Sequence, residues 1–189
     1  MSPGPQSEQQ QPRYASAMPT LVMDPPPAEF EALIERRRRL GLDHHDEMWE
    51  GVYHMAPAPN APHSFAGYQL AMLLNSPASA AGLYVGLEFN LGVQNDHRIP
   101  DLGVHRSRPT GAWVATAALV VEIVSPGDES WEKLPFYAAH DVDEVLIVDP
   151  EKRSVDWLGL QEGEYRPIAR SGLIELGADE LAQRIDWPG

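Results

Sequence analysis

The chain has 189 residues, of which 43% are hydrophobic, enough for one well-buried core but not comfortably for two domains. Its formal net charge of -14 argues against broad electrostatic attraction to nucleic acid or to an anionic membrane. Because it has no cysteine and no apolar run long enough to cross a bilayer, disulfides, thiolate metal sites and membrane spans are not expected, and we predict a cytoplasmic protein.

The first part of the chain divides into a tail and a helix. Residues 1–24 are rich in Pro, Gln and Ser, which predicts a disordered tail before a single domain over residues 25–189. Apolar side chains at helical spacing predict a helix from Pro27 to Leu40. The four arginines of Arg36–Arg39 spread around its axis, which favours a solvated face over a phosphate-binding one.

A strand and a second helix are predicted next. Apolar residues within 47–55 suit a strand, and Gly51 inside it suggests a bulge or a close backbone approach. After a proline-rich loop, apolar residues at helical spacing predict a helix over residues 63–74, with His63 in its first turn.

The clearest strand pattern of the chain lies at residues 82–93, where apolar side chains occupy every second position. Residues 94–97 have the composition of a turn. We therefore expect residues 99–104 to return antiparallel beside the first strand, with Asp101 at their start.

A strand, helix and strand are predicted in the second half of the chain. The apolar run 117–124 indicates a strand buried on both faces. A helix should start near Leu134, because the proline after it is tolerated only in a first turn, and this places Lys133 at the helix mouth. Residues 145–148 form a second buried strand, parallel to the first. The remaining predicted elements are strands at 154–160 and 165–169 and a helix within 177–187.

The acid Glu122 lies inside the apolar run, where an unpaired charge is costly to bury, so we expect it to meet a cation, a partner or water. Asp101 comes from a neighbouring extended segment, and the two acids can share one Mg²⁺ or Mn²⁺. Lys133, one of two lysines in the chain, can hold a phosphate oxygen or orient a water. The alternatives are that Asp101 caps a turn and that Glu122 pairs with an arginine such as Arg98.

Several short motifs together resemble a known family. They are Pro100-Asp101, Val121-Glu122-Ile123-Val124-Ser125-Pro126, Glu132-Lys133-Leu134-Pro135-Phe136-Tyr137 and Val148-Asp149-Pro150. In this order they resemble the Uma family of putative restriction endonuclease-like proteins, in the PD-(D/E)XK nuclease superfamily. The similarity also includes Trp49-Glu50-Gly51 and the closing Ile185-Asp186-Trp187-Pro188, and it covers residues 28–188.

The resemblance implies an α/β (α+β) restriction-endonuclease-like core, a mixed central β-sheet flanked by helices. It implies a Mg²⁺- or Mn²⁺-dependent endonuclease acting on DNA, with Asp101 and Glu122 as the metal-binding acids. The superfamily places a lysine two residues after the second acid, where this chain has Val124. The resemblance assigns that catalytic role to Lys133 instead.

Two further residues match the family pattern. Glu50 corresponds to an early acidic residue and is a further catalytic candidate, and His63 corresponds to a histidine on the next helix that is a possible additional metal contact. The alternative function is a catalytically silent module of the same fold that binds a protein or an anion, which the acidic composition and the displaced lysine favour. In either case we expect a homodimer.

Overall fold

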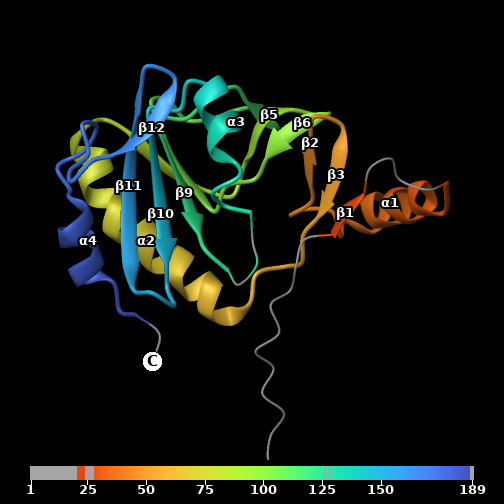
Figure 1. Ribbon diagram of the computed structural model, residues 1–189, viewed down its shortest axis with the longest axis horizontal. Coiled ribbons are helices and arrows are strands. Elements are labelled where there is room, and N and C mark those ends of the chain that lie inside the picture. Colours follow the sequence, from red (N-terminus) through yellow and green to blue (C-terminus); the bar gives the residue numbers. More distant parts are fainter. Residues whose placement is uncertain (1–20, 24–27, 126, 128, 188–189) are drawn as a thin grey trace, which may run out of the picture.

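A computed structural model describes residues 21–23, 28–125, 127 and 129–187, and these form helices and strands in two mixed sheets (Figure 1). The expected mixed α+β class is confirmed. Among the described residues, no helix has the length and apolar character that crossing a membrane requires. The helices are α1 (Ala28–Leu40), α2 (Ala61–Ala80), α3 (Leu134–Ala139) and α4 (Ala178–Arg184).

Each sheet has six strands. The sheet with the longer strands, here called the larger sheet, has the order β12-β11-β10-β9-β7-β4, and the smaller sheet has the order β1-β3-β2-β6-β5-β8. The strands of the larger sheet are β4 (Tyr84–Leu87), β7 (Leu102–His105), β9 (Leu119–Ile123), β10 (Glu144–Asp149), β11 (Ser154–Gln161) and β12 (Glu164–Pro167). Those of the smaller sheet are β1 (Leu21–Met23), β2 (Glu47–Trp49), β3 (Val52–Met55), β5 (Asn90–Val93), β6 (Asp96–Arg98) and β8 (Trp113–Val114).

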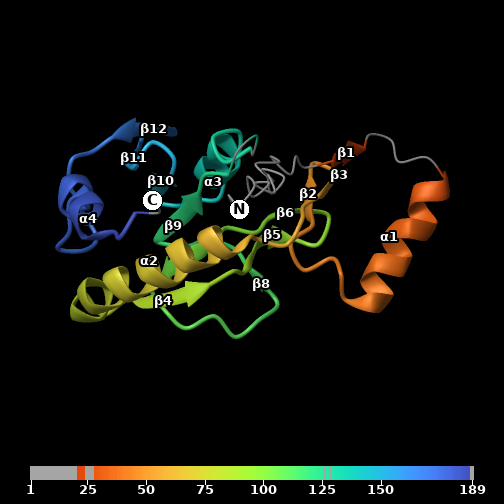
Figure 2. The same ribbon diagram turned by 90° about the horizontal axis from the view of Figure 1, so that it is seen from below.

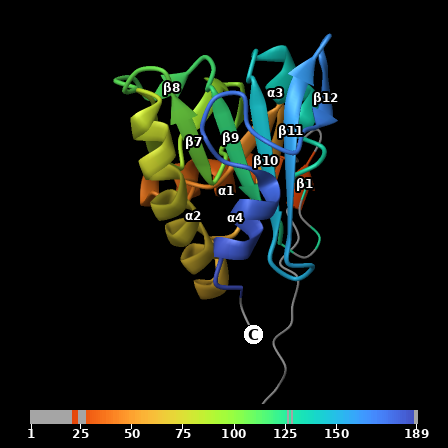
Figure 3. The same cartoon turned by 90° about the vertical axis from the view of Figure 1, so that its left-hand side faces the viewer.

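Two apolar cores lie on opposite faces of the larger sheet. Helices α2 and α4 cover one face and α3 covers the other (Figure 3). Side chains alternate along β9, so Leu119, Val121 and Ile123 pack with α2 and α4. Val120 faces the core below α3, and Glu122 shares its side of the strand.

Strands β9 and β10 pair in parallel, and α3 lies in the connection between them, as the sequence predicted. The N-cap residue of α3 is Lys133, and the proline of this helix lies in its first turn. This arrangement aims Lys133 along the face of β9 that carries Glu122.

The predicted single strand over residues 82–93 is wrong in one respect. It is broken at Glu88 and Phe89 into β4 and β5, which belong to different sheets. An alternating pattern cannot show where a chain leaves one sheet for another, because both strands keep the same periodicity. The predicted antiparallel pairing of the returning segment is confirmed, since β7 pairs with β4, but Asp96 and His97 of the predicted turn belong to strand β6.

The predicted disordered tail of residues 1–24 lies largely outside the described residues. Within it, β1 (Leu21–Met23) pairs antiparallel with β3. The single domain over residues 25–189 stays a prediction.

Strands β2 and β3 form a hairpin through the two-residue turn Glu50-Gly51. Both residues have positive φ angles, 50° and 90°, which is the conformation of a type I′ turn. A Cβ atom on Gly51 would meet nothing within 4 Å. The glycine is therefore there for its backbone conformation, and neither the bulge nor the close backbone approach that we expected is present.

Candidate active site

Three segments that are distant in the sequence bring Asp101, Glu122 and Lys133 together. Asp101 immediately precedes β7, and its Oδ2 accepts a hydrogen bond of 2.7 Å from the backbone N–H of Ile123 on β9. Lys133 Nζ lies 3.3 and 3.2 Å from Oε1 and Oε2 of Glu122. The trio predicted from the sequence is thus one cluster.

The cation beside Glu122 is Lys133 and not Arg98. The Arg98 guanidinium instead lies over the rings of Trp49 and Phe136, 4.4 and 4.0 Å from their centroids. It also donates a hydrogen bond to a backbone carbonyl of β2. Arg98 therefore fixes the packing of the smaller sheet against α3, and the alternative that paired it with Glu122 is wrong.

A third carboxylate, Glu47 on β2, belongs to the cluster and was not predicted. Its Oε1 lies 2.9 Å from Lys133 Nζ, so the ammonium bridges Glu47 and Glu122. The backbone N–H of Ile99 and the Trp49 indole N–H each donate to Glu47 at 2.7 Å. These fixed donors hold the Glu47 carboxylate in one orientation.

The structure does not bring Glu50 into this cluster. Glu50 lies exposed on the β2–β3 turn, and its backbone N–H donates to Oδ1 of Asp96 at 3.1 Å. Among the described residues, no hydrogen bond or ion pair joins its carboxylate to Lys133. Glu47 lies at the other end of β2, away from the turn, and it is this acid that contacts Lys133, where we expected Glu50. The pair Glu50-Gly51 before a β-branched residue was the available signal for a hairpin turn.

His63 contacts Asp101 from the first turn of α2. Asn60 caps this helix by accepting a hydrogen bond from the His63 backbone N–H at 3.0 Å. The His63 Nε2 lies 2.7 Å from Oδ1 of Asp101, and its Nδ1 lies 3.1 Å from Oγ of Ser125. A carboxylate accepts hydrogen bonds only, so Nε2 carries the proton and His63 orients Asp101.

Burial controls the protonation of Glu122. Its side chain is 4% exposed, and desolvation raises its pKa to about 8, although the charge of Lys133 opposes this rise. The nearby charges of Asp101 and Glu47 raise the pKa further. The hydroxyl of Tyr137, one turn after Lys133 on α3, donates a hydrogen bond to Oε1 of Glu122.

Lys133 stays an ammonium in this environment. Burial acts to lower its pKa, but the charges of Glu122 and Glu47 outweigh that effect and raise the pKa overall. The cluster therefore contains a fixed cation beside an acid that titrates near neutral pH. This is the kind of paired perturbation that is typical of functional sites.

The donor set suits a hard divalent cation that keeps part of its water shell. Among the described residues, no group of three or more His, Cys, Asp or Glu side chains is arranged to hold a metal ion. Mg²⁺ is usually bound by one or two carboxylates together with waters and substrate phosphates, so it does not require such a cage. The oxygens of Asp101 and Glu122 fit that description.

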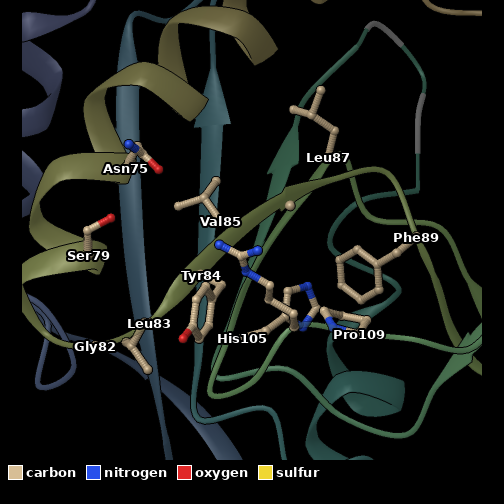
Figure 4. Close-up of a pocket in the computed structure, with 12 residues that line it drawn as sticks. Asn75, Ser79, Gly82, Leu83, Tyr84, Val85, Leu87, Phe89, His105 and Pro109 are labelled. Atoms are coloured by element: carbon tan, nitrogen blue, oxygen red, sulfur yellow. The ribbon is translucent and has the colours of Figure 1, made fainter.

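A pocket of about 550 Å³ lies away from the cluster, between α2 and β4 (Figure 4). It is lined by side chains that include Asn75, His105 and Arg108. His105 is the last residue of β7, whereas Asp101 lies just before the first residue, at the opposite end of the strand. His63 and Asn75 are twelve residues apart on α2, which is about 18 Å along a helix. The pocket is therefore not part of the carboxylate cluster.

Comparisons with known proteins point to one family. Residues 27–182 match the family model Uma2, described as putative restriction endonuclease. The crystal structure of a putative nuclease belonging to DUF820 from Anabaena variabilis ATCC 29413 is similar, with a TM-score of 0.62 and 17% identity over 74% of this chain and 90% of that chain. This likeness shows a shared fold. The DrdV–DNA complex has a TM-score of 0.36 and 18% identity over 61% of this chain and 10% of that chain. No curated protein shows significant similarity.

Proposed function

The chain belongs to the Uma2 family of putative restriction endonucleases, as its motifs predicted, and from this premise we propose that it is a divalent-metal-dependent endonuclease that hydrolyses DNA. The observation that carries the proposal is the Lys133 ammonium, held between the buried acids Glu47 and Glu122 beside Asp101. Fold alone does not imply activity, so the proposal rests on the site.

Each residue has a distinct role in this proposal. Asp101 and Glu122 would hold Mg²⁺ or Mn²⁺, and the bound ion would lower the pKa of a water and neutralise charge on the phosphate. Lys133 holds a non-bridging phosphate oxygen or orients the attacking water. Glu47 keeps the Lys133 ammonium in place, and His63 keeps Asp101 in its orientation. Because His63 is engaged with Asp101, we assign it a positioning role and not metal binding.

A homodimer also remains part of the proposal. Strand β4 lies at an edge of the larger sheet, and its Tyr84 and Leu87 are exposed. Apolar side chains on α2, including Phe65 and Met72, are exposed as well. These features favour self-association of the kind that two-fold symmetric dimers use.

Cleavage of plasmid and single-stranded DNA in the presence of Mg²⁺ or Mn²⁺ tests the proposed activity. We expect cleavage with either ion and none in EDTA, and loss of cleavage in Asp101→Ala and Glu122→Ala. Persistent cleavage by both variants would contradict the assignment. An inactive wild-type protein that also fails to bind millimolar Mn²⁺ in calorimetry would instead support the silent binding module.

We expect substitution of Glu47 to slow cleavage and substitution of Glu50 to leave it unchanged. Glu47→Gln keeps the size of the side chain but removes the charge that fixes Lys133, so we expect cleavage to fall by about 10²-fold, as for other groups that orient a reacting centre. Glu50→Gln, three residues away and exposed, is the matched control and should leave the rate unchanged. A larger loss in Glu50→Gln than in Glu47→Gln would restore Glu50 as the catalytic residue. Initial rates at saturating Mg²⁺ measure both.

A further inference from the structure

Helix α1 stands away from the rest of the molecule (Figures 1 and 2). From Phe30 to Leu40 none of its side chains is buried, and its apolar residues Leu33 and Leu40 are 38% and 57% exposed. Helices of this length gain most of their stability from packing an apolar face against a partner. The exposure of α1 therefore points to a partner outside the chain's own core.

One arginine of α1 anchors the helix to the body. Arg37 forms a two-pronged ion pair with the buried carboxylate of Asp46, with Nε–Oδ2 and Nη2–Oδ1 distances of 2.8 Å. It also donates to the carbonyl of Leu42 at 2.6 Å. Asp46 accepts further hydrogen bonds from the Tyr53 hydroxyl and from a backbone N–H. Since Asp46 adjoins Glu47, this anchor fixes the C-terminal end of α1 next to the strand that enters the active site.

The other three arginines face away from that anchor. Successive helical residues are about 100° apart, so Arg36 and Arg38 lie to either side of Arg37 and Arg39 lies on the far side. All three are exposed, and none makes an ion pair with a residue that the structure describes. The helix thus presents three uncompensated guanidinium groups within one turn.

Several exposed arginines elsewhere are compensated by carboxylates, although the exposed Arg108 contacts the Tyr84 ring instead. On the other side of the molecule in Figure 1, near β12 and α4, Arg166, Arg170 and Arg184 each lie within 3.9 Å of a glutamate carboxylate. The cluster on α1 therefore concentrates positive charge locally in a chain with a net charge of -14. The three acids of the helix, Glu29, Glu31 and Glu35, all precede the arginines, which leaves the positive charge at the end nearest the body.

Although the spacing of the arginines alone favoured a solvated face, we propose from the exposure and the missing ion pairs of α1 that it is an arm that binds the phosphate backbone of nucleic acid, through Arg36, Arg38 and Arg39. Guanidinium groups match phosphate oxygens in a bidentate geometry, and a regularly spaced polyanion can engage several of them at once. The choice of DNA as the polyanion rests on the proposed function. The arm supplies the affinity that an overall acidic protein otherwise lacks, and it acts independently of sequence.

Salt-dependent binding of a fluorescein-labelled DNA duplex, measured by anisotropy in EDTA with the full chain, tests the arm. The triple variant R36A/R38A/R39A should reduce the slope of log K against log salt concentration by about 2.7, or 0.9 for each lost phosphate contact. Alanine is the strongest helix former, so the helix itself is retained, and circular dichroism checks this. R36K/R38K/R39K should keep most of the slope because it keeps the charges.

The matched control is R166A/R170A/R184A, which removes the same charge from the compensated arginines and should leave the slope nearly unchanged. An unchanged slope in the α1 variant, an equal loss in the control, or no DNA binding by the wild type would each overturn the arm. The arm would also be overturned if the α1 variant differed from the wild type in the mass measured by sedimentation but not in the slope, because a second copy of the chain would then cover α1. If the wild type binds DNA through α1 but does not cleave it, the arm is supported and the nuclease activity is rejected. If the wild type cleaves DNA and the α1 variant leaves the slope unchanged, the nuclease activity is supported and the arm is rejected.

Discussion

Lys133→Met is expected to destabilise the protein by about 3–5 kcal/mol and to abolish DNA cleavage, because it leaves buried carboxylates without their cation. Lys133 Nζ contacts both Glu47 and Glu122, whose side chains are 7% and 4% exposed. Methionine keeps most of the length of the side chain, so the loss reports on charge and not on a cavity. Urea unfolding at pH 8.5, above the pKa of about 8 of Glu122, measures the change in the free energy of unfolding.

The chain provides a matched control, because its only other lysine is Lys152. Lys152 lies 2.6 Å from the Asp149 carboxylate, but its own side chain is 76% exposed, so Lys152→Met should change stability little. The double variant Lys133→Met, Glu47→Gln should recover part of the loss, since it removes one of the stranded charges. Equal stability of Lys133→Met and the wild type would show that the two acids are not held by this ammonium.

Local sequence patterns were sufficient for the part of the site that lies around β9 and α3. The apolar run marks β9 as buried, so its one acid is conspicuous, and the proline of α3 fixes the helix start and therefore Lys133. Tyr137 follows Lys133 by four residues, which puts both on one helix face. That spacing was a usable signal for the hydroxyl that reaches Glu122.

Local sequence patterns could not predict that Glu47 belongs to the site, for a physical reason. Its contact with Lys133 joins residues 86 positions apart and depends on how the smaller sheet docks beside α3, which no periodicity encodes. The same limit concealed the second sheet, because β4 and β5 share one alternating pattern. Turn chemistry was the one local signal that was available and misread, since the left-handed Glu50-Gly51 pair places Glu50 away from the site.

Glu122→Gln is expected to abolish cleavage while making the metal-free protein more stable above neutral pH. Burial raises the pKa of Glu122 from 4.5 to about 8, so between those values the folded state holds a proton that the unfolded state has released. Stability from this group is then complete below about pH 4.5 and is lost as pH rises toward 8, by up to about 1.4 kcal/mol per pH unit. Gln stays neutral, accepts the same hydrogen bond from Tyr137 and removes this slope.

Unfolding in EDTA at pH 5.5, 7 and 8.5 measures the difference between the variant and the wild type, which isolates Glu122 from the other titrating groups. The difference should be smallest at pH 5.5 and favour Glu122→Gln by a growing margin at higher pH, whereas the exposed control Glu164→Gln should show no such trend. Millimolar Mn²⁺ at pH 8.5 should raise the melting temperature of the wild type only, because binding to the folded state stabilises it by mass action. A pH-independent difference would mean that Glu122 is ionised throughout, and equal Mn²⁺ stabilisation of both proteins would remove it from the metal site.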